Sequence, residues 1–320
     1  MQPYYWASHH GNFGDDLNLW LWDYLLPGFR DVHADTMLVG VGTVLNPVLL
    51  PPGQKKLVIG SGYGYGEAPD INDPEWDVRC VRGPLTAAKL GLPLDRGITD
   101  PAALIPDMPE FQNLPKIHKK TFVPHWESAE FGMWQSVCEP AGLTWLDPRG
   151  EAKSVIRAIA QSEMIVAESM HGAILADAFR VPWIAVSTSR SINNFKWNDW
   201  AQSVGATYNP HFVPVSTRAE AVAKKTKFWG MSFDGGGGQQ QPAHHEPASA
   251  DASVMTRTSA PTAPAQSGLR GMAKQVLAAP SILALWQASR TEPQLSPDGM
   301  LQDKKQRFRA VLDEIRRDYF

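Results

Sequence analysis

Cysteine is scarce in this sequence, which contains only Cys80 and Cys138 among its 320 residues. Neither cysteine belongs to a CxxC pair or to a Cys/His cluster with the spacing of a zinc site. The histidine pairs at 9–10 and 244–245 also have no carboxylates arranged with them as a metal set. The sequence therefore predicts no obligatory metal, and it fits a reducing, cytoplasmic compartment.

Long apolar runs and an excess of one charge are also absent. No stretch reaches the roughly 18 apolar residues of a membrane-spanning helix, and the N-terminus lacks the basic start and apolar core of a signal peptide. Lys and Arg total 30 against 33 for Asp and Glu, a net charge of −3. Because binding to phosphate backbones needs a clear basic excess, we expect no nucleic-acid partner. These absences predict a cytoplasmic protein.

Apolar residues are plentiful, at 43% of the chain, and the length favours two domains. The composition changes near residue 231. Residues 231–268 are rich in Gly, Gln, Pro, Ser and Ala but poor in large apolar side chains, so we expect a disordered linker there. Beyond it, residues 269–320 form a tail with two expected helices, at 269–290 and 299–320.

Residues 1–230 alternate short apolar runs with amphipathic stretches. The expected strands lie at 36–44, 56–63, 77–83, 120–126, 163–169 and 181–187, and the expected helices lie at 84–91, 151–163 and 172–180. Strands that alternate with helices form parallel sheets covered on both faces. The sequence therefore predicts an α/β fold with two Rossmann-like domains, at 1–115 and 116–230, and a cleft between them.

One histidine stands at a junction that otherwise resembles protein core. In open parallel sheets, ligands bind where strands end and the next helices begin. Ser169, His171 and Gly172 occupy such a turn. The free N–H groups at the start of the following helix attract anions. His171 is thus placed to contact an anion and to deliver a proton, although position alone leaves a purely structural histidine equally open.

Several motifs occur together in a specific order. They are "GNFGDDLN" (11–18), "RGPLTAAKLGL" (82–92), "DPAALIP" (100–106), "FVPHWES" (122–128), the stretch 147–186 and "FKWNDW" (195–200). Their order and spacing resemble the polysaccharide pyruvyl transferase family, over residues 1–230. The resemblance implies a fold like the two-domain glycosyltransferase B architecture. It also implies transfer of the enolpyruvyl unit of phosphoenolpyruvate to two hydroxyls of a lipid-linked exopolysaccharide repeat unit, which forms a cyclic ketal.

This chemistry requires groups that hold two anionic substituents and move protons. Phosphoenolpyruvate carries a phosphate and a carboxylate, which cationic side chains and N–H groups bind. Ketal formation adds a proton to the methylene carbon, a step suited to an imidazole. His171 matches the histidine of the family's "HG" element, which implies acid/base catalysis, with Ser169 and Gly172 contacting phosphoenolpyruvate. The resemblance implies no cofactor, with phosphoenolpyruvate as the donor substrate.

The chain departs from the family at one charged position. Many members carry an arginine in an "RLHG" sequence, where this chain has Ser-Met-His-Gly at 169–172. The missing charge must then come from elsewhere, and Arg82 at the end of its expected strand is the first candidate. Arg149 and Arg190 follow it, although each arginine could equally be solvated at the surface. His125, at another strand end, is a second candidate for contacting the phosphate.

Sugar recognition is expected from the first motif and from a tryptophan. Asn12, Gly14 and Asp15 would line the cleft from the N-terminal side and hydrogen-bond to sugar hydroxyls. The same residues would also suit a turn that starts a helix at 16–26. Trp197 could stack on a sugar ring, but in a chain with 12 tryptophans most of them belong to cores.

Two other functions fit the same architecture. A glycosyltransferase that uses nucleotide sugars would need a ribose-binding acid, for which Glu163 and Glu168 are available. A saccharide-binding relative without activity is the other alternative, because of the missing arginine.

The tail also has two interpretations. No acidic residue occurs between 252 and 291. The apolar, basic stretch 269–290 could lie in the headgroup region at the inner face of the cell membrane. Alternatively, it could dock on the first domain.

Overall fold

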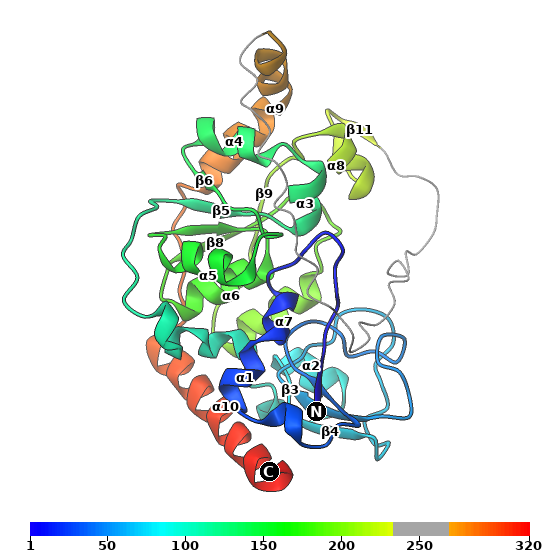
Figure 1. The fold of residues 1–320 in the computed structure, drawn as a ribbon. Coiled ribbons are helices and arrows are strands. Elements are labelled where there is room, and N and C mark those ends of the chain that lie inside the picture. The colour runs from blue at the N-terminus through cyan, green and yellow to red at the C-terminus, as the bar shows by residue number, and fades with distance from the viewer. Residues whose placement is uncertain (233–268) are drawn as a thin grey trace.

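The computed structural model describes residues 1–232 and 269–320, which build two parallel β-sheets (Figure 1). The first sheet has the strand order β1-β2-β3-β4 (Gln2–Tyr4, Thr36–Val39, Lys55–Ile59 and Trp76–Cys80). The second has the order β6-β5-β7-β8-β9 (Thr144–Trp145, Thr121–Val123, Ile165–Ala167, Trp183–Ser187 and His211–Phe212). The expected α/β fold with two parallel sheets is confirmed.

The central strands are apolar along their whole length because both faces of each sheet are covered. In β2 all four residues are buried, and Leu38 pairs with Leu57 of β3 in parallel register. In the second sheet β7 is fully buried and pairs with both β5 and β8. Such continuous burial is typical of parallel sheets, and it made these strands recognisable in the sequence.

Short helices cover the first sheet. They are η1 (Asp15–Leu19), α1 (Leu21–Leu25), η2 (Phe29–Asp31), α2 (Pro84–Lys89), η3 (Leu94–Arg96), η4 (Pro101–Asp107) and η5 (Pro109–Phe111). The helix expected at 16–26 is divided into the 3-10 helix η1 and the single turn of α1. The side chain of Asn18 hydrogen-bonds to both backbone groups of Val41. This tie to a neighbouring loop competes with a continuous helix.

Helices of six to ten residues accompany the second sheet. They are α3 (Trp126–Phe131), α4 (Trp134–Ala141), α5 (Ala152–Ala160), α6 (Met170–Ala178), α7 (Asn194–Ser203) and α8 (Arg218–Ala223). The helices expected at 151–163 and 172–180 are confirmed as α5 and α6. A small antiparallel hairpin follows, with strands β10 (Lys227–Phe228) and β11 (Met231–Ser232).

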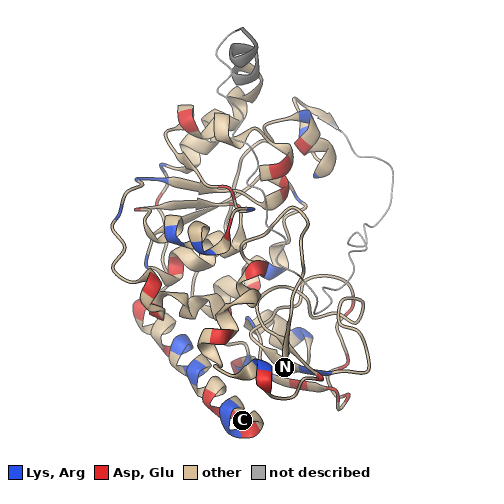
Figure 2. Ribbon diagram, in the orientation of Figure 1, with Lys and Arg blue, Asp and Glu red and all other residues tan. Residues whose placement is uncertain are grey.

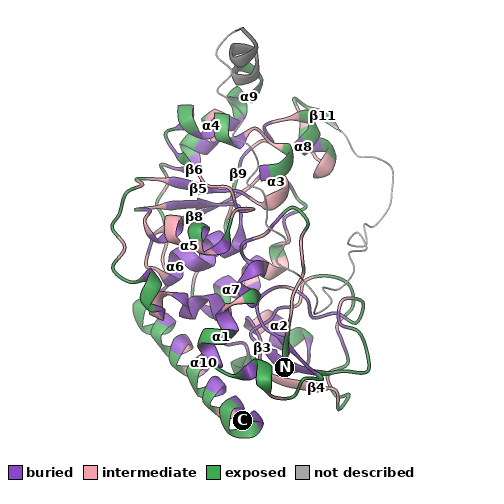
Figure 3. Cartoon of the chain, in the orientation of Figure 1, coloured by how far each residue is buried: buried purple, intermediate pink, exposed green. Residues whose placement is uncertain are grey.

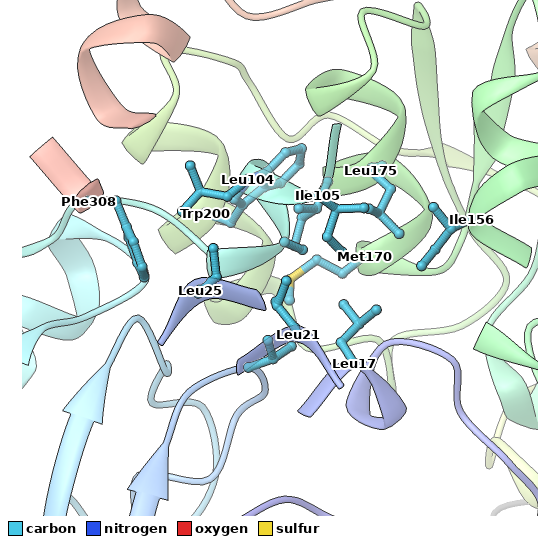
Figure 4. Close-up of a cluster of buried hydrophobic side chains, with 14 of the residues drawn as sticks. Leu17, Leu21, Leu25, Leu104, Ile105, Ile156, Met170, Leu175, Trp200 and Phe308 are labelled. Atoms are coloured by element: carbon cyan, nitrogen blue, oxygen red, sulfur yellow. The ribbon is translucent and has the colours of Figure 1, made fainter. Parts of the chain in front are cut away.

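One hydrophobic core joins the two sheets. Leu38 and Ile59 of the first sheet belong to the same buried cluster as Ile165 of the second sheet. Helix α6 packs against η4, and its Met170 belongs to this cluster together with Ile105 of η4 (Figure 4). Helix α7 packs against α2 across the same boundary. The two halves therefore meet through packed side chains.

The two C-terminal helices dock on different halves. Helix α10 (Asp298–Tyr319) lies along the first half, where Lys305 binds Asp107 at 2.6 Å and Tyr319 donates to Asp77 at 2.6 Å. Helix α9 (Leu269–Ala288) packs on α4 of the second half. Both expected helices are confirmed. The alternative that the 269–290 helix docks on the first domain is wrong, because α9 packs on the second half. Of the expected linker, residues 231–232 belong to β11, and 233–268 lie outside the described residues.

Candidate active site

Loops from the two sheets meet face to face at the carboxyl ends of their strands. The loop after β3 reaches the second half through the Gly64 carbonyl, which accepts a hydrogen bond from Asn193 at 2.6 Å. The loop after β1 approaches more closely still. A Cβ atom on Gly14 would lie only 2.0 Å from Nδ1 of His171. Glycine is therefore required at position 14, because any side chain would displace the imidazole.

His171 lies in the first turn of α6, directly after β7. Ser169 caps this helix by accepting a hydrogen bond from the Gly172 N–H at 3.3 Å, as serine commonly does at helix starts. The imidazole is 8% exposed and packs edge-on against Phe13. The structure thus brings Ser169, His171 and Gly172 together with the Gly14 loop at the boundary between the halves.

A buried carboxylate faces the imidazole from the first half. Asp100 caps η4 through Oδ1, and its Oδ2 lies 3.7 Å from Nε2 of His171. Neither Oδ2 nor Nε2 has a hydrogen-bond partner among the described residues. Buried polar atoms are nearly always paired, so two unpaired atoms that face each other mark a functional position. A carboxylate on this side favours the tautomer with its proton on Nε2 and orients the ring.

A second carboxylate borders the same imidazole. Asp15 accepts a hydrogen bond from Asn12 Nδ2 at 2.5 Å. Burial raises the pKa of Asp15 from 3.8 to about 6, although His171 and Lys196 partly oppose the shift. A carboxyl group with such a pKa exchanges protons close to neutral pH. The structure therefore places Asn12, Gly14 and Asp15 beside His171.

Lys196 is a cation that the sequence analysis missed. It lies in the first turn of α7, and among the described residues no carboxylate lies within ion-pair distance of its ammonium. Its charge acts on the pKa values of both Asp15 and His125, so the ammonium lies within electrostatic reach of each. Lys196 belongs to the motif "FKWNDW", from which the sequence analysis selected only the neighbouring Trp197. Lys196 is available to bind an anion.

Arg82 is placed behind the site rather than at its surface. Its guanidinium is fully buried and donates to Asp199 at 3.2 Å, to Thr43 at 2.8 Å and to the Tyr63 carbonyl at 3.2 Å. Asp199 belongs to α7 and also accepts from the hydroxyl and N–H of Thr86. Arg82 therefore holds α7, and with it Lys196, against the first half.

The other two arginines differ in whether carboxylates bind their guanidinium groups. Arg149 is bound by Asp147 at 2.7 Å and by Glu130, and these carboxylates neutralise its charge. Arg190 lies exposed in the loop after β8, and it has no ion pair with any described residue. Of the two, only Arg190 has an unoccupied guanidinium.

His125 lies at the end of β5, the strand next to β7. It precedes α3, and its Nδ1 lies 3.5 Å from Oε2 of Glu127 in the same helix. Burial lowers the pKa of His125, and the positive charges of Lys196 and Lys224 act in the same direction. The structure brings His125 to the same sheet edge as His171 but sets it against a carboxylate of its own half.

Glu168 ties together the strand ends that carry these histidines. Its carboxylate accepts from the His125 N–H at 3.0 Å, from the Ser128 hydroxyl at 2.6 Å and from Lys224 at 2.8 Å, and also from Thr188 in the loop after β8. Burial would raise the pKa of Glu168, but the positive charges of Lys224 and His125 and the hydrogen bonds from Lys224 and Ser128 together outweigh burial and lower the pKa to about 2. The Glu168 carboxylate therefore stabilises these segments by linking them.

Neither acid considered for a nucleotide site is placed to bind a ribose. Glu168 is fully buried and saturated by its partners. Glu163 is exposed and precedes β7, so it lies at the opposite, amino edge of the sheet. The structure therefore offers no support for these residues in the nucleotide-sugar alternative.

The tryptophan that was predicted to stack on a sugar ring lies in the protein core. Trp197 is fully buried, and its ring stacks on Tyr208 at 4.7 Å and packs against Trp200 at 6.3 Å. Trp126, at the start of α3, is only half-buried and stacks on the exposed ring of His10 at 5.4 Å. Trp126 is therefore the more exposed of these two tryptophans.

The described residues contain no group of three or more His, Cys, Asp and Glu side chains arranged to hold a metal. No helix in the described ranges is long and apolar enough to cross a membrane.

Comparison with known proteins gives the family of the chain. A model of the polysaccharide pyruvyl transferases matches residues 12–190, and the chain belongs to this family. The match begins in the loop that contacts His171 and ends in the loop after β8. The chain is similar to the succinoglycan biosynthesis protein ExoV of Rhizobium meliloti (strain 1021), with 64% identity over 321 residues that cover 100% of both chains. No solved structure matches it significantly.

Proposed function

We propose that this protein transfers the enolpyruvyl unit of phosphoenolpyruvate to a sugar of an exopolysaccharide repeat unit and forms a cyclic pyruvate ketal. Family membership and the similarity to a succinoglycan biosynthesis protein support pyruvyl transfer to a polysaccharide. The observation that carries the proposal is the position of His171 at the boundary between the halves, against Gly14 and 3.7 Å from Asp100, with the charges of His171 and Lys196 acting on Asp15. His171 and Asp15 can move two protons, and Lys196 can bind an anion.

The donor would bind through its two anionic groups. The first N–H groups of α6 have no carbonyl partner in the helix and attract anions. The ammonium of Lys196 supplies the positive charge that the family's "RLHG" arginine provides elsewhere, with Arg82 holding α7 in place. Arg190 is a further cation on the same sheet edge, and Ser169 and Gly172 lie at the helix start.

The reaction then needs one acid and one base. His171 donates a proton to the methylene carbon of phosphoenolpyruvate, which becomes a methyl group while positive charge develops at the neighbouring carbon. Asp15 accepts the proton of the first sugar hydroxyl as its oxygen attacks that carbon. The carbon–oxygen bond to phosphate breaks, and phosphate leaves as hydrogen phosphate with the proton that Asp15 accepted. The second hydroxyl closes the ring, and its proton balances the one that His171 donated.

The acceptor would lie against the loop of the first half. Asn12 and Asp15 carry the polar atoms of this loop, and Gly14 allows it to touch the imidazole. Trp126 offers a partly open ring on the opposite side. A saccharide between them would place two neighbouring hydroxyls near His171. In the cell we expect this saccharide to be lipid-linked, with the protein in the cytoplasm.

Ligand-induced stabilisation and phosphate release test this proposal together. A ligand that binds only the folded state raises the melting temperature by mass action. We expect phosphoenolpyruvate to raise it and nucleotide sugars to leave it unchanged. With an acidic exopolysaccharide fragment stripped of pyruvate, phosphate release should require both substrates. Stabilisation by a nucleotide sugar alone, with no phosphate release, would instead favour the glycosyltransferase alternative.

A further inference from the structure

Helix α9 is apolar on two opposite faces. Its inner face packs on the second half through Ala278, Leu285 and Ala288, which are all buried. Its outer face carries Val276, Leu283 and Trp286, which are 66%, 55% and 38% exposed. A helix docked on a globular protein normally presents polar side chains to solvent. An apolar outer face therefore indicates a partner other than water.

Helix α10 shows the ordinary pattern in the same chain. Its inner face is apolar, with Phe308 and Ile315 fully buried. Its outer face is polar and charged, with Asp303, Arg309 and Arg316 exposed (Figure 2). The two helices have similar lengths and both dock on a sheet domain, so the apolar outer face of α9 is specific to that helix.

The neighbouring hairpin enlarges the apolar surface. Trp229, in the turn between β10 and β11, donates its indole N–H to the Leu277 carbonyl of α9 at 3.0 Å. Trp229, Met231 and Leu277 are each at least half exposed. We call the exposed side chains of Trp229, Met231, Val276, Leu277, Leu283 and Trp286 the apolar tip. It lies at the end of the molecule opposite the C-terminus (Figures 1 and 3).

Most exposed charges around the apolar tip are positive. Among residues 218–232 and 276–290, the exposed charged residues are Arg218, Lys225, Lys227 and Arg290. The acid in these two ranges is Glu220, which is buried and bonded to Trp134 and Ser216. Exposed acids occur beside them at Glu139 of α4 and at Glu292. The surface is thus apolar in its centre and predominantly basic at its margin.

Three partners for such a surface can be compared. The chain's own segment 233–268 contains only three large apolar residues, Phe233, Val254 and Met255, which are too few to cover it. A second copy would bring basic margin against basic margin. An anionic bilayer supplies an apolar interior and negative headgroups together, and tryptophan favours the interface between them. The bilayer satisfies both features.

We propose that the apolar tip docks on the surface of an anionic membrane, with Leu283 and Trp286 inserted among the lipids and the basic margin against the headgroups. This docking does not depend on the proposed function. Because the tip belongs to the second half and lies away from the loops that surround His171, docking leaves the candidate active site uncovered.

Vesicle co-sedimentation of the full-length protein tests the proposal. We expect binding to phosphatidylcholine vesicles that contain phosphatidylglycerol, much weaker binding to pure phosphatidylcholine, and release by salt, because exposed charges are screened. The variant Leu283→Ser/Trp286→Ser removes two inserted side chains and should lower the partition coefficient by about tenfold or more. Leu94→Ser, which alters a side chain 63% exposed on the first half, is the matched control and should bind like the wild type.

Three outcomes would overturn the proposal. The first is a wild-type protein that does not bind vesicles containing phosphatidylglycerol. The second is equal binding by the double variant, provided that its melting temperature matches the wild type. The third is a wild-type dimer in sedimentation velocity that the double variant converts to a monomer, which would assign the apolar tip to a second copy.

Discussion

His171 and His125 occupy equivalent places in the second sheet but face different halves of the molecule. They follow the adjacent parallel strands β7 and β5, and each lies at the start of a helix. His171 faces Asp100 and Asp15 of the first half, whereas His125 lies beside Glu127 of its own helix. Both histidines therefore lie at the carboxyl edge of the second sheet. The carboxylates of the first half make His171, rather than His125, the candidate for acid/base chemistry.

The largest expected effect comes from His171. Replacing it with alanine removes the group that donates the proton, and loss of one acid/base group costs roughly 10²–10⁴ in rate. The fold should survive, because the ring packs on a loop rather than within a sheet. Phosphate release and circular-dichroism melting check the two parts. The matched variant His125→Ala should lose less than about tenfold. Equal losses from both variants would break the comparison.

Arg82 and Lys196 separate anion binding from support. Lys196→Ala should raise the Michaelis constant for phosphoenolpyruvate by about ten- to a hundredfold at an unchanged melting temperature, because a charge-assisted contact is lost. Arg82→Ala should raise the same constant and also destabilise the fold by about 3–5 kcal/mol, because Asp199 is left buried without its partner. Urea unfolding measures the difference. An equal rise in the constants for both substrates would instead move the anion contact to Arg190.

The ionisation of Asp15 should make the free energy of unfolding depend on pH. Its pKa rises from 3.8 to about 6 in the folded protein, so the folded state holds this proton where the unfolded state has lost it. The contribution to stability is complete below about pH 4 and is lost as the pH rises through about 6. Asp15→Asn removes this loss, so the variant should be more stable than wild type at pH 7.5 by up to about 3 kcal/mol. Urea titrations at pH 4 and 7.5 measure the difference, and a gain that is equal at both values would contradict it.

The last expected effect is that of Asp100, whose Oδ2 faces His171. Asn in its place can still cap η4 but loses the charge beside Nε2. We expect kcat to fall by about ten- to a hundredfold, as when a carboxylate partner of a functional histidine is removed, with both Michaelis constants unchanged. Nitrogen-15 NMR of the imidazole provides the independent readout. An unchanged tautomer would show that Asp100 acts only as a cap, even if the rate falls.

The fold could be predicted from the sequence because its signals are local. The stretches 36–44 and 163–169 each contain a short buried run, and each run appears as a parallel strand. The end of β7 also indicated His171 as a candidate. The divided helix after residue 15 could not be predicted, because it depends on the contact of Asn18 with Val41 in a distant loop.

The remaining parts of the site depend on contacts across the boundary. The burial of Arg82 follows from Asp199 in the other half, and the meeting of Asp100 with His171 follows from the packing of η4 on α6. Neither pair is close in sequence. Lys196 and Trp197 show a different difficulty. Consecutive residues on a helix point in different directions, so the motif that contains both gave no indication that the lysine faces the site and the tryptophan the core.

The most direct test of the central claim is NMR of the product formed in D₂O. The protein is incubated with phosphoenolpyruvate and a depyruvylated saccharide fragment, and the methyl group of the product is observed. If a protein acid protonates the methylene carbon, the methyl group of the ketal carries one deuterium, and one phosphate is released for each ketal. The account predicts this product from wild type and His125→Ala but not from His171→Ala. A ketal methyl group without deuterium, or the same product at the wild-type rate from His171→Ala, would contradict it.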